Sequence, residues 1–311
     1  MDDCGFDDLE ELDSYQALAA ATNQLITDPP PEIDPVATVK RLVPLLGMAG
    51  EVGSLLVEFK KHIRDGDAHR LFPEQVAEEL GDILWYLSST ATNFDLSLRD
   101  LAAANLLKTR RRWPATGEDL PTYLLFDDEC EPGEQIPREF TVEIEDVQDG
   151  DGRCHVEITI DGVPAGNHLR DNAAAEDYYR FHDVFHLAHA AMLGWSPVLR
   201  GKLLEPQRKR HDPLLDEVED GGRAVVIDEA IVAYVWGYAV NHRMLDGVTT
   251  VDYQVLKTVS ALTAGLEVSA RRLYEWEEAI LAGYRVFRGV VAARGGIIKV
   301  NLLDRSIELS T

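Results

Sequence analysis

EELGDILWYL, residues 78–87, is the most informative stretch of this sequence. Its apolar residues recur at the spacing of an amphipathic helix, and residues three apart, such as Glu79 and Asp82, lie on one helix face. Pro73 comes shortly before the stretch, and proline suits the first turn of a helix. The pattern therefore predicts a helix that starts near Pro73 and presents two carboxylates on the same side.

A second acidic stretch, GEVGSLLVE at residues 50–58, lies in a longer predicted helix over residues 36–64. Glu51 and Glu58 share a face of that helix. Residues 65–73 have the composition of a turn, so we expect a helical hairpin with carboxylates facing each other across a narrow gap. Such a cluster repels itself unless a divalent cation binds, and Mg²⁺ prefers carboxylate oxygens. The sequence therefore predicts a magnesium site for chemistry on phosphates.

Length and composition fit a folded protein with one large domain or two ordinary ones. The chain has 311 residues, of which 45% are hydrophobic, and no apolar run reaches the roughly 18 residues of a membrane span. The acidic N-terminus lacks the basic and apolar regions of a signal peptide. Three scattered cysteines, Cys4, Cys130 and Cys154, form no CxxC motif and predict no disulfide framework. We therefore expect a cytoplasmic protein without a membrane partner.

The net charge of −25 is concentrated in two stretches. Residues 1–14 carry seven acidic and no basic side chains, and residues 127–151 carry eleven acidic side chains and one basic one, Arg138. Together they contribute −17, and such runs are usually solvated surface. The balance argues against a nucleic acid polymer as partner, because phosphate backbones need clustered Lys and Arg. It does not exclude a small anionic ligand in a local basic pocket.

Helical periodicity dominates the chain on both sides of a domain boundary that we place near residues 115–135. Helices are expected at 14–26, 36–64, from 73 onward, 98–112, 173–193, 225–244 and 251–294. Strands are expected at 140–147, 154–160 and 297–309. The sequence DGDG at 149–152 predicts a hairpin of the first two strands, which the third can join.

Asn105, Lys108 and Arg112 form one stripe on the helix expected at 98–112. A metal-bound triphosphate needs further cations to hold its remaining charge, so the stripe is a candidate for phosphate binding. The alternative for the basic run at the end of this helix is a solvated C-terminus that the helix dipole favours.

The ordered series of these motifs resembles the MazG-type all-α nucleotide pyrophosphohydrolases. The series consists of GEVG at 50–53, EELGDILWYL at 78–87 and NLLK at 105–108, and Tyr15-Gln16 is similar to the first helix of that family. The resemblance covers residues 14–113, and the order of the motifs is more specific than any one of them.

The resemblance implies a mainly α fold. An all-α, MazG-like helical bundle is expected at residues 1–115, followed by an acidic linker at 116–138. Residues 139–311 are then expected to form a mostly helical C-terminal domain with a small β element, of the kind seen as an extension in some MazG-like proteins.

The resemblance also implies hydrolysis of a nucleoside triphosphate to a monophosphate and pyrophosphate, with Mg²⁺ or Mn²⁺ as cofactor. Glu51, Glu79 and Asp82 match the metal ligands of the family, and Lys108 would steady the phosphates. Glu51 or Glu58 is the candidate to orient or deprotonate the attacking water. Members of the family form dimers or dimers of dimers, so we expect a homodimer or homotetramer.

Ser54 departs from the family pattern, in which the first acidic pair is Glu-x-x-Glu. Because a neutral hydroxyl is a poor replacement for a carboxylate, three outcomes stay open. Glu58, one turn further on, could act as the ligand, the site could hold fewer ions with waters in the gap, or activity could be lost. Trp85 and Tyr15 are candidates to stack on the base, and a core or interface aromatic is the alternative for each.

The C-terminal half contains one cluster of candidate transition-metal ligands, in HDVFH at residues 182–186. His182 and His186 have the His-x₃-His spacing of a metal site, with Asp183 between them. Glu229, on a later expected helix, could supply a carboxylate. His-Asp pairs also occur in the metal-dependent phosphohydrolases named for that dipeptide, but the further ligands of that family are not evident. The alternatives are histidines that only make hydrogen bonds, or a ligand-sensing pocket.

The sequence therefore favours an Mg²⁺-dependent nucleoside triphosphate pyrophosphohydrolase that removes noncanonical or excess nucleotides. The second hypothesis is a non-catalytic nucleotide-sensing or regulatory module, in which Ser54 marks a degenerate site. The third is a helical scaffold in a defence or toxin system. Release of pyrophosphate in the presence of Mg²⁺ separates the first hypothesis from the other two.

Overall fold

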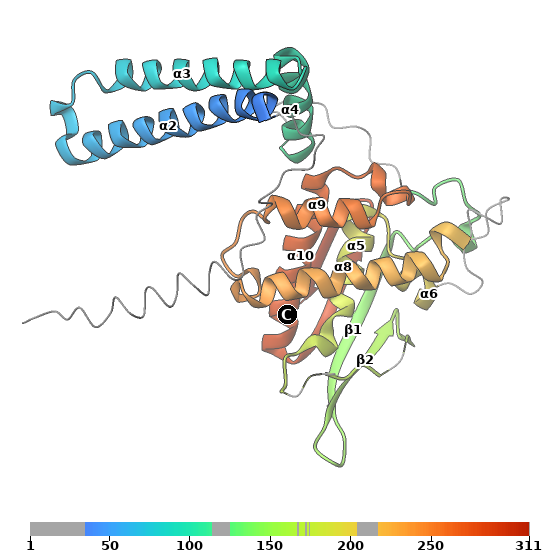
Figure 1. The fold of residues 1–311 in the computed structure, drawn as a ribbon. Coiled ribbons are helices and arrows are strands. Elements are labelled where there is room, and N and C mark those ends of the chain that lie inside the picture. Colours follow the sequence, from blue (N-terminus) through green and yellow to red (C-terminus); the bar gives the residue numbers. More distant parts are fainter. Residues whose placement is uncertain are drawn as a thin grey trace, which may run out of the picture. The chain divides into compact units, whose positions relative to one another are not determined.

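A computed structural model describes residues 35–113, 125–203 and 217–310, apart from 167, 172 and 174. The chain divides into two compact units, Met1–Asn105 and Leu106–Thr311. Helices make up most of the described residues, and a five-stranded antiparallel sheet lies in the second unit (Figure 1). The expected fold class, mainly α with a small sheet, is confirmed.

Two long helices, α2 (Pro35–Asp65) and α3 (Phe72–Asn93), form the described part of the first unit. A 3-10 turn at Gly66–Ala68 joins them, where the sequence predicted a turn. Helix α4 (Leu98–Arg112) follows with the predicted bounds and crosses into the second unit. The helix expected at 14–26 lies outside the described residues.

Close packing of α2 on α3 depends on a small residue. A Cβ at Gly47 would lie 2.2 Å from the Tyr86 ring, so only glycine fits without a shift. Asn93 Nδ2 donates to the Lys40 carbonyl at 3.0 Å and ties the end of α3 to α2. These contacts make the predicted hairpin antiparallel and bring opposite stretches of the two helices into register.

One helix among the described residues, Thr38–Ala68, is long and apolar enough to cross a membrane by length and composition. Its best window has a mean hydropathy of 1.5 and is 11% buried. The sequence predicted no apolar run of the roughly 18 residues that a membrane span needs. A single such helix is weak evidence for a membrane span.

The sheet of the second unit has the strand order β3-β2-β1-β4-β5. Its strands are β1 (Glu139–Gln148), β2 (Cys154–Ile160), β3 (Val163–Pro164), β4 (Gly295–Asn301) and β5 (Ser306–Ser310). β1 and β2 form the predicted hairpin, with Val142 opposite Ile160. β4 pairs with the other edge of β1, with Val142 opposite Ile298, so residues 295–310 extend the hairpin as their strand character indicated.

Five longer helices accompany the sheet in the described residues of this unit. They are α5 (Asp183–Leu193), α6 (Pro197–Leu203), α8 (Gly222–Val240), α9 (Tyr253–Leu262) and α10 (Leu273–Ala293). The single helix expected over 251–294 is therefore two helices, because Gly265 takes φ +90° in the segment between them. The helix expected over 173–193 begins only at Asp183, after a 3-10 turn at Tyr179–Phe181.

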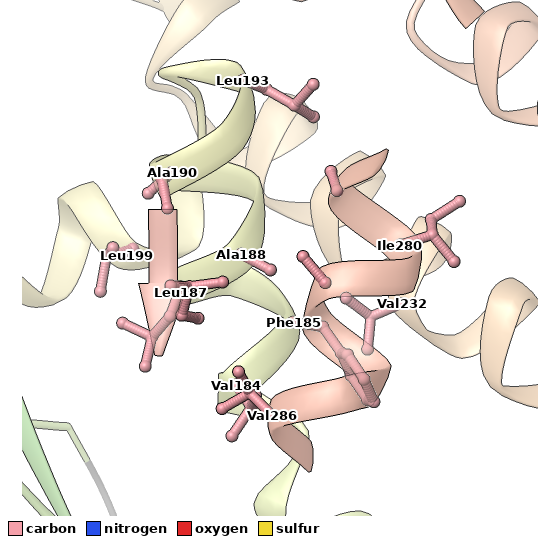
Figure 2. Close-up of a cluster of buried hydrophobic side chains, with 14 of the residues drawn as sticks. Val184, Phe185, Leu187, Ala188, Ala190, Leu193, Leu199, Val232, Ile280 and Val286 are labelled. Atoms are coloured by element: carbon pink, nitrogen blue, oxygen red, sulfur yellow. The ribbon is translucent and has the colours of Figure 1, made fainter. Parts of the chain in front are cut away.

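In the core of the second unit, α5 packs against α10, α8 and the sheet. In Figure 2, Phe185 and Ala188 lie on the side of α5 that faces α10, and Val232 of α8 lies near Ile280 of α10. A Cβ at Gly283 would lie 3.1 Å from that of Ala188, so the two helices approach closely. Every residue of α5 except Met192 is buried, which fixes the helix that carries the HDVFH motif.

Residues 125–138 pack into the second unit, whereas the sequence predicted a linker over 116–138. Leu125 and Ile136 belong to the core, and Asp127 is only 1% exposed. Asp127 forms ion pairs with Arg138 at 2.7 Å and Arg200 at 2.8 Å. The acidic composition suggested solvated surface, but arginines that the fold brings in neutralise this carboxylate inside the unit.

Candidate functional sites

Carboxylates of α2 and α3 meet across the helical hairpin. Glu79 hydrogen-bonds to Glu51, and Asp82 and Glu78 add negative charge nearby. Desolvation is the largest cause that raises the pKa of Glu79, followed by the hydrogen bond and charge of Glu51. Glu51 and Glu79 thus lie in contact with the charge of Asp82 nearby, which favours a proton or a cation. Among the described residues, however, these three carboxylates do not place one oxygen each within 4.8 Å of the others.

Glu58 lies apart from this group. Its buried carboxylate contacts Lys61 Nζ at 2.5 Å and His69 Nε2 at 3.2 Å. Glu58 follows Glu51 by seven residues, which is about 10 Å along a helix with a rise of 1.5 Å per residue. Ser54 stands half-buried between them. The structure therefore engages Glu58 in ion pairs near the turn and does not bring it to Glu79.

The other side chains proposed for the N-terminal site are placed separately. Trp85 is 64% exposed on α3. Asn105 and Lys108 are exposed on α4, where Lys108 Nζ lies 6.0 Å from the ring centroid of Tyr253. The side chain of Arg112 and the whole of Tyr15 lie outside the described residues. The roles of these residues in substrate binding stay predictions.

A second group of ligand-type side chains meets between α5 and α8. One ligand atom each of His182, His186 and Glu229 lies within 4.8 Å of the others. Glu229 Oε2 is 3.4 Å from His186 Nε2 and 3.8 Å from His182 Nε2. Asp183 Oδ1 is 3.7 Å from His182 Nε2. The four residues predicted for a second site are therefore neighbours in the fold.

Asp228 supports this group from the interior. Its Oδ1 lies 3.0 Å from His186 Nδ1 and 2.8 Å from His189 Nδ1, and Ser196 donates its hydroxyl to Oδ2 at 2.7 Å. Burial would raise the pKa of Asp228, but His186 and His189 outweigh burial and lower the pKa. A carboxylate on this side of His186 favours the ring proton at Nδ1, which leaves Nε2 facing Glu229.

Burial and neighbouring charges shift the pKa values of the residues in this group in opposite directions. Burial would lower the pKa of His186, but Asp228 and Glu229 raise it to about 10. For His182 burial prevails and lowers the pKa. Burial would raise the pKa of Asp183, yet the charge of Lys202, which hydrogen-bonds to Oδ2, holds that pKa low. The group therefore concentrates the carboxylates of Asp183, Asp228 and Glu229 around His186 and Lys202.

Arg180 fixes the segment that leads into α5. Its fully buried guanidinium contacts three carboxylates, those of Asp146, Asp171 and Glu176. The carbonyl of Tyr179, the residue directly before Arg180, accepts a hydrogen bond from His182 Nδ1 at 2.9 Å. The orientation of the His182 ring is thus set by the backbone at the start of the helix, with Nε2 directed away from that carbonyl.

The structure also shows groups that the sequence did not indicate. Lys202 belongs to no motif that the sequence analysis identified, and the fold places it against Asp183, 19 residues earlier in the chain. A third ligand-type group consists of His155, Glu157 and His168. The two ring nitrogens of His155 already contact Asp149 at 3.0 Å and Glu157 at 3.1 Å, so this group is explained by its own ion pairs.

Comparisons with known proteins bear on the second unit above all. The family model for the MazG C-terminal domain matches residues 121–311. Among curated proteins, the Gene 37 protein of Mycobacterium phage L5 is 32% identical over 69 residues, which are 22% of this chain. The chain spans only 60% of the length of that relative. No solved structure matches.

Proposed function

The chain belongs to the MazG C-terminal domain family, and from this premise we propose that it hydrolyses nucleoside triphosphates to monophosphates and pyrophosphate with Mg²⁺. Family membership indicates a function related to nucleotides. The motifs at 50–53, 78–87 and 105–108 support the finer proposal of a pyrophosphohydrolase. Its role would be to remove noncanonical or excess nucleotides in the cytoplasm.

The observation that carries the proposal is the contact between Glu51 of α2 and Glu79 of α3, with Asp82 one turn further on. The carboxylates lie close enough to raise the pKa of Glu79. Their oxygen atoms are the kind of ligand that a hard divalent cation prefers. Magnesium bound there would polarise phosphate oxygens and offset charge on the leaving pyrophosphate. Glu51 would orient the attacking water and accept its proton.

One observation favours the second candidate function, a nucleotide sensor without turnover. Ser54 occupies the position where the resembled family has a second carboxylate, and Glu58 is held by Lys61 and His69. Three carboxylates then remain where a catalytic site of that pattern has four. Nucleotide binding in Mg²⁺ without release of pyrophosphate would support this alternative.

Glu79→Gln tests the proposed site. We expect release of pyrophosphate from a panel of nucleoside triphosphates to require Mg²⁺ and to fall at least about 100-fold in the variant, because a ligand carboxylate is lost. The melting temperature should be unchanged or higher, since the substitution removes charge repulsion at this position.

Glu74→Gln is the matched control, because Glu74 lies in the first turn of the same helix and is exposed. It should leave the rate of pyrophosphate release within about twofold of wild type, as expected for a surface substitution. A wild-type rate in Glu79→Gln would refute the assigned site, and a wild-type protein without turnover on any nucleotide would refute the activity.

A further inference from the structure

The geometry points to a divalent transition-metal site in the second unit, with His182, His186 and Glu229 as protein ligands. The site is separate from the α2–α3 carboxylates and does not depend on the proposed function. His186 lies in α5, His182 is the residue directly before that helix, and Glu229 lies in α8; both helices pack in the core.

The spacing of the three side chains fits metal coordination better than direct hydrogen bonding. Tetrahedral ligands with bonds of about 2.0–2.1 Å stand about 3.3 Å apart. Glu229 Oε2 lies 3.4 Å from His186 Nε2 and 3.8 Å from His182 Nε2, longer than a charge-assisted hydrogen bond of about 2.7–2.9 Å. One ligand atom of each residue lies within 4.8 Å of the other two, so a small contraction would place all three on a shared metal ion.

Both histidines are oriented as metal ligands usually are. The Tyr179 carbonyl accepts from Nδ1 of His182, and the Asp228 carboxylate lies against Nδ1 of His186. Partners of this kind set the tautomer and leave the Nε2 lone pair for the metal. Asp228 is held in turn by His189 at 2.8 Å, so the support extends into the core.

Three buried polar atoms at the site have no hydrogen-bond partner: Oδ1 of Asp183 and both ring nitrogens of His186, whose side chain is 1% exposed. Nδ1 of His186 still lies 3.0 Å from Asp228 Oδ1, whereas Nε2 has no such close carboxylate. An unpaired buried polar atom costs about 1–3 kcal/mol, so its presence calls for a partner. A metal at Nε2 and a metal-bound water at Asp183 Oδ1 would satisfy these two atoms.

Charge balance supports the same conclusion. Asp183, Asp228 and Glu229 bring three negative charges, and Lys202 supplies one positive charge through its contact with Asp183. A divalent cation offsets the remaining two.

The donor set defines the class of ion and leaves one position open. Two imidazoles with one carboxylate suit zinc, cobalt, nickel or manganese, whereas Mg²⁺ prefers oxygen ligands alone. Glu229 is 44% exposed and His182 13%, so the site opens to solvent on their side. Three protein ligands and an accessible fourth position are typical of zinc sites that bind a water or a substrate.

Titration of the full-length, metal-stripped protein with Co²⁺ tests the site. We expect one Co²⁺ per chain with the intense visible absorption of four-coordinate cobalt, displaced by Zn²⁺. Glu229→Gln should weaken binding at least about tenfold, and Asp228→Asn about 10–100-fold, since outer partners of ligating histidines contribute that much. Glu229 is half-exposed, so its variant should fold even if a His186 variant does not.

His242→Gln is the control, because His242 is exposed and its ring contacts Tyr238, through a hydrogen bond to the carbonyl and stacking on the ring, away from the proposed ligands. It should bind Co²⁺ as wild type does, and so should Glu79→Gln, which removes only an α2–α3 carboxylate. Absence of four-coordinate cobalt in wild type, or an unchanged spectrum in Glu229→Gln, would overturn the inference. Loss of the spectrum in His168→Gln instead would assign the ion to the third group and overturn it equally.

Discussion

Some acidic side chains are buried where the composition of the sequence predicted solvent exposure. The stretch at 127–151 predicted solvated surface, yet Asp127 is buried and the Asp146 side chain is only 3% exposed, each paired with arginines. Arg200 follows Asp127 by 73 residues, a separation that no local pattern reveals. The spacing of acidic residues within one helix was predictable, whereas partners from distant segments were not.

Asp127 should make the second unit sensitive to acid. Burial would raise its pKa, but Arg200, the Ile136 N–H and Arg138 lower it below 3.8. A carboxyl with a lowered folded pKa stabilises the fold above its unfolded pKa, and this stability is lost as pH falls through the folded value. Urea unfolding of Asp127→Asn at pH 7 should show a loss of about 3 kcal/mol that shrinks toward pH 3.

Glu308→Gln is the control for that prediction, because Glu308 is an exposed carboxylate of β5. It should change the free energy of unfolding by no more than about 0.5 kcal/mol at either pH, as is usual for a surface substitution. A loss that is the same at pH 3 and pH 7 in Asp127→Asn would show that the charge of Asp127 is not what stabilises the unit.

At the scale of elements, local periodicity predicted most helices and the β1–β2 hairpin. It missed the break between α9 and α10, because apolar periodicity continues through a segment that Gly265 turns with φ +90°. It also placed Gly295 and Gly296 as the end of a helix, whereas they begin β4 after Arg294 takes the left-handed conformation. The two glycines correctly indicated that α10 ends here, but they did not indicate that a strand follows directly.

Gly295→Ala should destabilise the junction of α10 and β4. Gly295 has φ +132°, and a Cβ there would lie 2.4 Å from the Ile144 carbonyl oxygen of β1. We expect a loss of about 2 kcal/mol in the free energy of unfolding by urea, because both the backbone and the neighbouring strand resist a side chain.

Gly237→Ala provides the contrast, since Gly237 lies exposed inside α8 with open space around its Cα. It should stabilise the protein by about 0.5–1 kcal/mol through helix propensity. Equal effects of the two substitutions would mean that the strands do not approach as closely at Gly295 as described.

For the whole molecule, the sequence could predict less of the contacts in the histidine site than of those between the α2–α3 carboxylates. The α2–α3 carboxylates come from neighbouring helices, so spacing and a turn could predict that Glu51 lies near Glu79, but not that Glu58 pairs with Lys61 and His69. The histidine group needs Glu229 of α8 beside the start of α5, and only the tertiary fold brings these together. The sequence singled out His182, Asp183, His186 and Glu229, whose role stays a prediction. It did not indicate Asp228 as the support of His186 or Lys202 as the partner of Asp183.

Self-association is the prediction for the whole molecule. The α2–α3 hairpin exposes large apolar side chains, among them Leu56 at 64%, Leu84 at 57% and Trp85 at 64%. Exposed apolar surface of this extent usually marks an interface, and we expect a homodimer or homotetramer that covers it. Light scattering after gel filtration should give at least twice the chain mass, and Leu84→Lys should shift it toward the monomer.

Leu303→Lys is the control, because Leu303 is 62% exposed in the second unit, between β4 and β5. It should leave the measured mass unchanged. A monomer at all concentrations of the wild-type protein would contradict the expectation, and so would equal dissociation by the two lysine substitutions.

The strand order has a consequence for synthesis on the ribosome. β1 starts at residue 139, but its neighbour β4 pairs Asn301 with Glu139, and β5 ends at residue 310. At about 5–20 residues per second, β1 waits roughly ten to thirty seconds before its second partner has been translated. Throughout that interval one edge of the nascent hairpin stays open to chaperones and proteases, so the sheet cannot be completed until residues 295–310 have been translated.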